Sequence, residues 1–200
     1  MADCFRVSGG VPLRGSVRPS GNKNAALPMI AATLLADGPS ELINVPRIRD
    51  VEALLALLTD LGADVGWTDE NVVRIDPRSV QSKALDPVLC ASIRASILLA
   101  GPLLARFGTV TLPPPGGDVI GRRRLDTHFL AFEQLGGEVE IGAAYNLSAK
   151  HLVGADIFLD EPSVTATENA LMAAVLAEGR TVLRNAALEP HVQDLGNALV

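Results

Sequence analysis

A weak internal repeat with a period of about 70 residues runs through this chain. Each copy begins with an apolar segment that is typical of a helix and that stops at a glycine, at 31–38, 97–108 and 171–179. Each glycine is expected to adopt the left-handed conformation that ends many helices. A short run typical of a β-strand follows every time, at 41–43, 109–112 and 181–183.

A second helix follows in the first two copies. The leucines of 51–62 stand at helical spacing, and the segment 125–136 has the same pattern. Each of these helices leads into a predicted pair of strands, 64–67 with 72–75 and 138–141 with 145–148. Helices and strands that alternate in repeated units indicate an α/β fold of stacked units.

The third copy stops early. Its second helix is predicted to start near Glu189, and the chain ends at Val200, before a closing glycine or a strand pair. A domain that ended there would leave Leu195 and Leu199 without apolar partners. We therefore expect this chain to be the front part of a longer protein.

Composition narrows the class of protein. With 48% hydrophobic residues the chain can bury a large core, and its net charge of −6 argues against a general nucleic-acid binder. Cys4 and Cys90 have neither metal-ligand spacing nor the number needed for a disulfide framework, which favours a reduced, cytoplasmic setting. The N-terminus lacks the regions of a signal peptide, and no apolar run is long enough to span a bilayer.

The loop 113–128 is the most informative motif. It places Asp118 in a glycine-flanked segment, shortly before the three arginines 122–124. Glycines let a backbone approach a ligand closely, and arginine forks suit carboxylate and phosphate oxygens. The pattern favours an acid that acts on an anionic substrate. A surface loop with solvated charges is the alternative reading of the same residues.

The segment 20–28 is the second motif. Lys23 and Asn24 stand near a predicted helix start, where they can donate hydrogen bonds to a phosphate or a hydroxyl group. A capping turn with a solvated lysine explains the same residues without a ligand.

Taken together, these two motifs resemble the enolpyruvyl transferases, and in particular the family that acts on UDP-N-acetylglucosamine. The resemblance runs from about Phe5 to Val200. Further matching segments are 94–97, 101–103, 116–128, 162–169 and 185–190.

The resemblance implies an inside-out α/β barrel of two domains, each built from βαβαββ units. Residues 1–20 would then belong to the second domain, which is mostly absent from this chain. Residues 21–200 would form the other domain, truncated in its third unit.

The resemblance also implies a reaction. The enolpyruvyl group of phosphoenolpyruvate would pass to the 3′-hydroxyl of UDP-N-acetylglucosamine with release of phosphate, the first committed step of peptidoglycan synthesis. Neither a metal nor an organic cofactor is implied, and no nucleic acid or membrane partner. A non-catalytic domain of the same fold that binds a nucleotide sugar, or an inactive fragment, is the alternative.

Residue roles follow from the same resemblance. Lys23 and Asn24 would hold phosphoenolpyruvate, Lys23 also taking part in catalysis, and Arg94 and Arg123 would clamp anionic groups. The nucleotide-sugar site would comprise Arg123, Arg124, Leu125, Asp126, Thr127, Glu161, Ser163, Val164 and Thr165. Arg94 as an ordinary ion-pair partner and Asp126 as a helix cap are the alternatives. His128 is interpreted as structural.

Asp118 would be the proton donor, at a position where many members of the family have a cysteine. Fosfomycin alkylates that cysteine, and some members carry aspartate instead. Acid catalysis would be retained here, and the protein is expected to be insensitive to fosfomycin.

Overall fold

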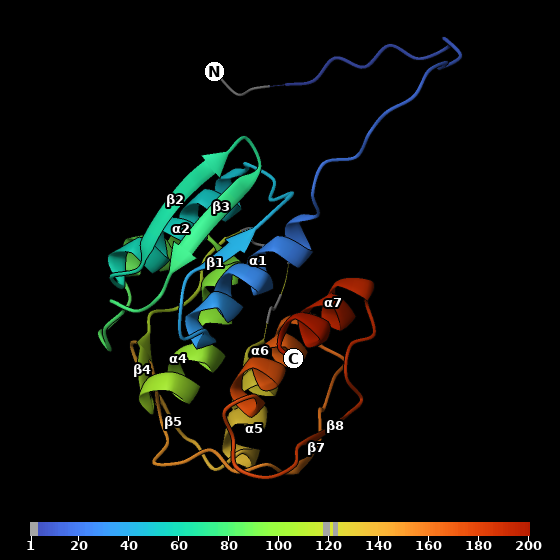
Figure 1. Cartoon of the computed structure of the whole chain (residues 1–200). Coiled ribbons are helices and arrows are strands. Elements are labelled where there is room, and N and C mark those ends of the chain that lie inside the picture. The colour runs from blue at the N-terminus through green and yellow to red at the C-terminus, as the bar shows by residue number, and fades with distance from the viewer. Residues whose placement is uncertain (1–3, 118–120, 122–123) are drawn as a thin grey trace.

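A computed structural model describes residues 4–117, 121 and 124–200 of the chain. The first repeat begins with a helix that continues as a short 3₁₀ helix. A strand, a second helix and a pair of strands follow (Figure 1). Their bounds are α1 Lys23–Ala32, η1 Thr33–Leu35, β1 Ser40–Leu42, α2 Arg49–Asp60, β2 Asp64–Asp69 and β3 Val72–Asp76.

The second repeat has the same helix–strand–helix–strand-pair order with α3 before it, whereas the third begins with β7 and reaches only its second helix, α7. The second comprises α3 Pro87–Ser92, the 3₁₀ helix η2 Arg94–Leu99, α4 Ala100–Phe107, β4 Thr109–Leu112, α5 Asp126–Gln134, β5 Glu138–Ile141 and β6 Tyr145–Ser148. The third comprises β7 Asp156–Phe158, α6 Val164–Ala174, β8 Val182–Arg184 and α7 Pro190–Ala198.

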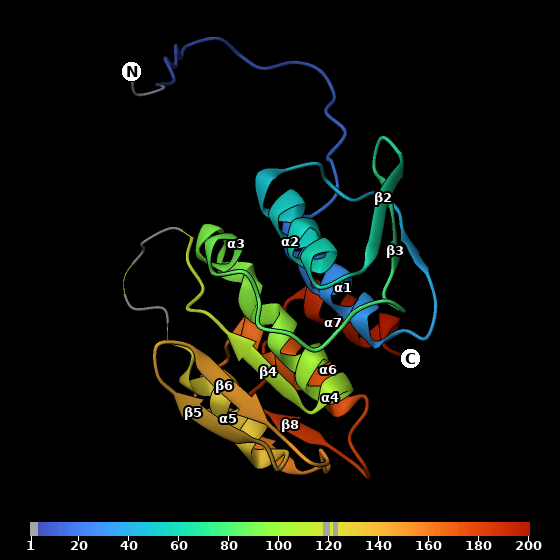
Figure 2. The same ribbon diagram turned by 90° about the vertical axis from the view of Figure 1, so that its left-hand side faces the viewer.

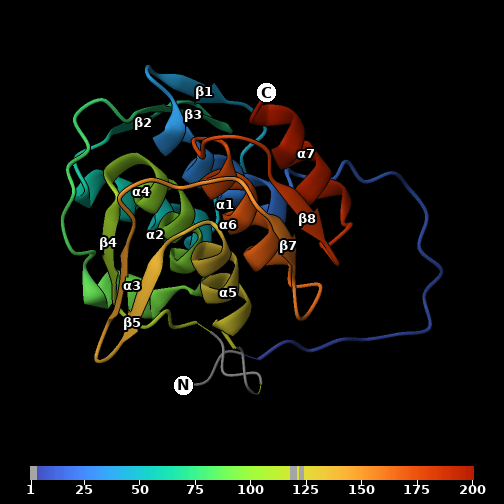
Figure 3. The same ribbon diagram turned by 90° about the horizontal axis from the view of Figure 1, so that it is seen from below.

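The strands form three separate small sheets. The orders are β1-β3-β2 and β4-β6-β5, both antiparallel, and β7 pairs with β8 in parallel. Figures 2 and 3 show the sheets on different sides of the molecule, with helices between them. The predicted architecture, helices inside and sheets outside, is confirmed.

The helices form the core because their apolar faces point at one another. In α2, Leu54, Leu57 and Leu58 are completely buried, and Leu61 after the helix end is nearly so. This is the i, i+3, i+4, i+7 spacing of one helix face, and each such leucine contributes about 1.5–3 kcal/mol by leaving water. Phe132 of α5 is also fully buried. Among the described residues, no helix has both the length and the apolar character needed to cross a bilayer.

An extended segment before the second unit lies beside β4. The Leu85 amide donates to the Thr111 carbonyl over 3.3 Å, and the hydroxyls of Ser82 and Thr109 lie 3.3 Å apart. The segment 82–85 therefore contacts β4 at two points, in the same chain direction. In the first unit, residues 4–19 instead extend away from the helices, and all of them are exposed (Figures 1 and 2).

The expected glycine stops are only partly confirmed. Gly108 caps α4 with φ 71°, and Gly62 and Gly136 take positive φ after α2 and α5. Gly38 does not, because α1 continues as the 3₁₀ helix η1, which ends at Leu35 with Ala36 as its cap, before this glycine. Gly179 has φ 90° but stands beyond the end of α6 at Ala174, so it does not cap that helix.

Candidate active site

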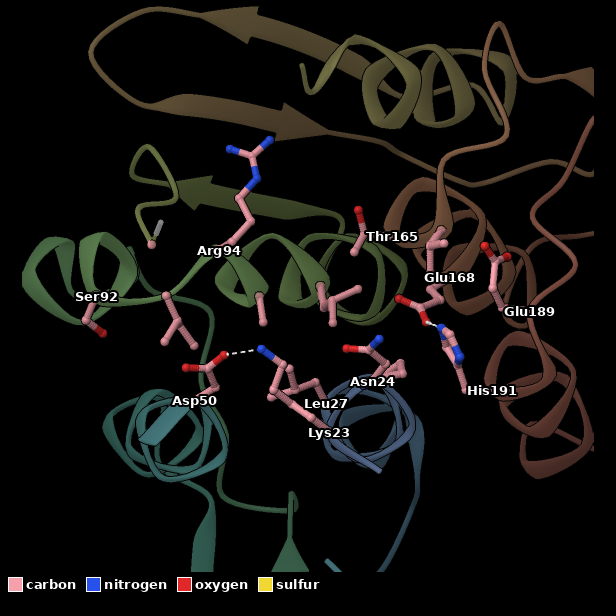
Figure 4. A pocket seen from close by; sticks show the side chains of 16 residues that line it. Lys23, Asn24, Leu27, Asp50, Ser92, Arg94, Thr165, Glu168, Glu189 and His191 are labelled. Atoms are coloured by element: carbon pink, nitrogen blue, oxygen red, sulfur yellow. Dashed lines mark hydrogen bonds and ion pairs between the residues drawn. The ribbon is translucent and has the colours of Figure 1, made fainter. Parts of the chain in front are cut away.

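A pocket of about 380 Å³ lies where the beginnings of five helices meet. Lys23 and Asn24 start α1, Arg94 starts η2, and Val164 and Thr165 start α6. The other two starts contribute Asp50 from α2 and His191 from α7 (Figure 4). Helix N-termini carry partial positive charge and unpaired N–H groups, so this arrangement favours an anionic ligand.

Lys23 forms an ion pair with Asp50 at the pocket. Its Nζ lies 2.8 Å from Asp50 Oδ2, and the two side chains remain 49% and 40% exposed. An ion pair this exposed contributes at most about 1 kcal/mol, so a ligand anion can compete for the lysine. Helix capping is done by the preceding residue, Asn22, whose Oδ1 accepts from the Ala25 amide. A cation in the first turn opposes the helix dipole, so Lys23 does not serve helix stability.

Asn24 stands one turn before a proline inside the same helix. Pro28 has no N–H, so the Asn24 carbonyl receives no helical hydrogen bond from residue 28. Both residues line the pocket.

Arg94 connects the pocket to a second polar group, which we call the rim cluster: Arg124, Asp126, Thr127 and Asp160. The Arg94 Nη2 donates to the Arg124 carbonyl over 3.3 Å. Arg124 Nε in turn donates to Asp126 Oδ2 over 2.6 Å, which raises the pKa of the guanidinium. Thr127 Oγ1 donates to Asp160 Oδ1, also over 2.6 Å.

The rim cluster settles how Asp126 is used in this structure. Asp126 is the first residue of α5, the cap is Leu125, and no side-chain hydrogen bond caps the helix. The carboxylate is paired with Arg124 instead. Ser163, by contrast, is a cap: its Oγ accepts from the Ala166 amide at the start of α6.

The predicted site residues thus fall into two groups. Five of them line the pocket: Lys23, Asn24, Arg94, Val164 and Thr165. The others that are described lie outside its lining: Arg124, Leu125, Asp126, Thr127, Glu161 and Ser163. The predictions for Asp118 and Arg123 fall outside the described residues.

The two glycines before Asp118 allow the backbone of this loop to lie close to the backbone of α3 and η2. A Cβ on Gly116 would meet the Ala91 carbonyl oxygen at 1.7 Å, and the Gly116 amide donates to the Cys90 carbonyl. Gly117 has φ 86° and lines the pocket next to Arg94. The close approach expected of these glycines is therefore made to α3 and η2.

A buried network lies behind Thr165. His128 is 2% exposed, and its ring nitrogens face Thr165 Oγ1 at 3.1 Å and Asn169 Nδ2 at 3.0 Å. The Asn169 Oδ1 accepts from the Gly101 amide, and its Nδ2 donates to the Ile97 carbonyl and to the ring. His128 Nδ1 is therefore an acceptor, and Nε2–H donates to Thr165.

Burial, and then the charge of Arg94, lower the pKa of His128 to about 3. The ring is consequently neutral near pH 7, with its single N–H directed at Thr165. Because the Thr165 oxygen accepts this bond, its own proton is available to an acceptor in the pocket. His128 thus has the structural position expected for it, and it orients a residue of the site.

Four acidic or histidine residues of the pocket are not predicted from the sequence: Asp50, Glu168, Glu189 and His191. Glu168 is 2% exposed, and burial and then Glu189 raise its pKa to about 8. The sequence could have indicated Glu168, because residue 168 lies on the same face of the predicted helix as residues 164 and 165. Asp50 belongs to the first repeat, and Glu189 and His191 stand at the start of α7, so helix spacing does not place them beside α1 or α6.

Residues 7–200 of the chain match the family model described as EPSP synthase (3-phosphoshikimate 1-carboxyvinyltransferase). The UDP-N-acetylglucosamine 1-carboxyvinyltransferase of Bradyrhizobium diazoefficiens is 64% identical over 196 residues, which are 98% of this chain and 46% of that protein. The protein of the same name from Treponema denticola is 54% identical over 191 residues, 96% of this chain and 45% of its own length.

A solved structure has the same fold. The enolpyruvyl transferase NikO from Streptomyces tendae matches with a TM-score of 0.81 at 24% identity, over 96% of this chain and 45% of that one. The chain thus spans about half the length of the relatives it matches. On the match of residues 7–200 to the family model, the chain belongs to the EPSP synthase (3-phosphoshikimate 1-carboxyvinyltransferase) family.

Proposed function

We propose that this chain is part of an enzyme that transfers the enolpyruvyl group of phosphoenolpyruvate to the 3′-hydroxyl of UDP-N-acetylglucosamine. The observation that carries the proposal is the 64% identity, over 98% of the chain, to a protein named for that activity. The reaction would begin peptidoglycan synthesis in the cytoplasm.

The chemistry of the pocket supports an anionic substrate. Phosphoenolpyruvate carries a phosphate and a carboxylate, and the pocket offers Lys23, Arg94 and the beginnings of five helices. We assign Lys23 and Asn24 to phosphoenolpyruvate, and Arg94 and Arg123 to anionic groups of the two substrates. Fixed cations of this kind can stabilise phosphate as it leaves, and the proposed reaction requires no metal or cofactor.

Nucleotide-sugar recognition is assigned to the neighbouring residues. These are Arg123, Leu125, the rim-cluster residues Arg124, Asp126 and Thr127, and the residues before and at the start of α6, Glu161, Ser163, Val164 and Thr165. The oriented hydroxyl of Thr165 supports this assignment, because it offers a donor to an oxygen of the ligand. Arg123 rests on the sequence resemblance alone.

Asp118 is assigned as the proton donor, again on the resemblance, and its neighbour Gly117 lines the pocket. In the first step the carboxyl proton adds to the methylene carbon, and the sugar hydroxyl oxygen bonds to the adjacent carbon while losing its proton to a base. In the second step the adduct loses phosphate and one methyl proton, which restores the carbon–carbon double bond. The base would belong to the part of the protein that this chain lacks.

We also propose that residues 1–20 belong with that second domain. The extended, exposed course of residues 4–19 supports this, since Phe5 and Leu13 are almost fully exposed and need apolar partners. Residues 21–200 would then form the remaining domain, which carries the pocket.

The test is a chimera in which this chain replaces the 196 matched residues of the Bradyrhizobium relative. Phosphate release from phosphoenolpyruvate should require UDP-N-acetylglucosamine and should be lost in Lys23→Ala and Asp118→Ala. Lys83→Ala is the matched control, because Lys83 is paired with Asp60 at 3.0 Å and is similarly exposed, but lies outside the pocket. Fosfomycin should leave the activity unchanged, since no cysteine stands at position 118.

A folded chimera that releases no phosphate would refute the proposal. If it nevertheless bound UDP-N-acetylglucosamine, the result would favour the alternative, a non-catalytic domain that binds a nucleotide sugar.

A further inference from the structure

In the described part of the chain, the pocket wall contains two buried polar atoms that lack a hydrogen-bond partner. Among the described residues, Glu168 Oε1 and His191 Nε2 are the buried side-chain nitrogen and oxygen atoms without a hydrogen-bond partner. They face each other at 3.9 Å, one from α6 and one from α7 (Figure 4). Buried polar groups in folded proteins are nearly always satisfied, so a coincidence of two in one pocket indicates a functional pair.

The charge of this pair is constrained by its surroundings. The Glu168 side chain is 2% exposed and that of His191 is 14% exposed. A buried carboxylate without a proton or a cationic partner is strongly disfavoured, and the nearby Glu189 adds repulsion of the same sign. One proton on either Glu168 or His191 removes that cost, and a shift of less than 1 Å would place it in a hydrogen bond between them.

The other charged residues of the pocket are Glu189 before α7, Lys23 on α1, Asp50 on α2 and Arg94 on η2. His128 on α5, behind the pocket, is titratable but neutral near pH 7. Lys23 is already opposed by Asp50 at 2.8 Å. An unprotonated Glu168–His191 pair would therefore add a negative charge to a pocket whose cations are partly compensated, and would repel an anion.

We propose that Glu168 and His191 share one proton and act as a charge-compensating pair, which keeps the pocket able to accept an anionic ligand. The two residues are positioning residues, because they set the charge of the wall. Loss of the shared proton at high pH leaves one net negative charge on the pair and weakens anion binding. The identity of the anion, phosphoenolpyruvate, rests on the proposed function, whereas the shared proton does not.

The deciding experiment needs no ligand. In the chain labelled with ¹³C at glutamate carboxyls and ¹⁵N at histidine rings, NMR follows Glu168 and His191 from pH 5 to pH 10. A shared proton requires both signals to move with common midpoints, because coupled sites titrate as a pair. Replacing either partner, in Glu168→Gln or His191→Gln, should move the midpoint of the other by one pH unit or more, about tenfold in proton affinity.

The exposed His151 is the internal control, and its titration should be the same in all three proteins. Near-UV circular dichroism establishes that each variant is folded, and the less buried His191→Gln provides the test if Glu168→Gln is not. Separate midpoints that are unaffected by substitution of the partner would overturn the proposal.

The ligand arm measures the affinity of the chimera for phosphoenolpyruvate and for inorganic phosphate between pH 6 and pH 9. From pH 6 to pH 9, the affinity of the unsubstituted chimera should fall about tenfold or more relative to that of its Glu168→Gln variant, whose affinity should depend less on pH. Equal pH dependence in both proteins would refute the charge-compensating role. Absence of any binding would refute the proposed function, while the NMR titration would still decide whether the proton is shared.

Discussion

Replacing Asn169 by alanine should destabilise the fold more than any other single polar substitution we consider. The side chain is completely buried and serves three partners: the Gly101 amide, the Ile97 carbonyl and His128 Nδ1. These groups belong to α4, η2 and α5, so one amide group links three helices to α6. Alanine would leave all three without this partner.

The magnitude follows from those three groups. Each buried polar group that loses its partner costs about 1–3 kcal/mol. We therefore expect a loss of about 3–6 kcal/mol in the free energy of unfolding, allowing for some relaxation. That is a large part of the 5–15 kcal/mol or so that is typical of a domain. Urea denaturation followed by circular dichroism measures it directly.

The matched control is Asn146→Ala. Asn146 also uses its Oδ1 in a hydrogen bond, from Thr111 Oγ1 over 2.9 Å, but it is exposed on β6. Water can replace that bond, so its loss should cost less than about 1 kcal/mol. If Asn169→Ala cost no more than Asn146→Ala, the argument that burial makes the network essential would be refuted.

Three further predictions concern pH, reactivity and packing. The pKa of Glu168, about 8 in place of 4.5, means that the folded state binds an extra proton between these values, so stability should fall as pH rises from 4.5 through 8. The fall is at most about 5 kcal/mol, since a neighbouring imidazole can offset part of it, and Glu168→Gln should remove it from denaturation curves measured across this range. Cys90 is buried, and burial raises its pKa to about 11, so iodoacetamide at pH 8 should modify only the exposed Cys4; mass spectrometry finding two adducts on folded protein would contradict this. A Cβ on Gly101 would lie 2.6 Å from a backbone oxygen of α6, so Gly101→Ala should cost about 1–3 kcal/mol, whereas Gly66→Ala, with no atom within 4 Å, should cost clearly less in the same thermal unfolding assay.

Much of the secondary structure could be predicted from local patterns of apolar residues and glycines in the sequence. Thr109–Leu112 forms the strand expected of it, and the leucine spacing of 51–62 corresponds to α2. Such features are predictable because helix and strand periods, and the left-handed preference of a glycine such as Gly108, act between near neighbours in the chain. The helix start expected near Lys23 is also found, with Asn22 as its cap and Pro28 inside the helix.

Two elements were not predicted, and each has a physical reason. The helix α3 is only six residues long, too short for an apolar period, although Asp86 caps it with bonds to the amides of Val88 and Leu89. The strand β7 has three residues and depends on its parallel pairing with β8, which residues 159–181 separate from it in the chain. Long-range pairing of this kind leaves little trace in local composition.

The candidate site divides along the same line. The sequence by itself determined the α/β units, the acid-and-arginine loop and the polar residues at the beginnings of α1 and α6. Only the tertiary structure brought five helix beginnings to one pocket, set Asp50 against Lys23, and placed Glu168 opposite His191. The reason is that residue spacing specifies which face of a helix is polar, whereas the packing of separate repeats decides which polar faces meet.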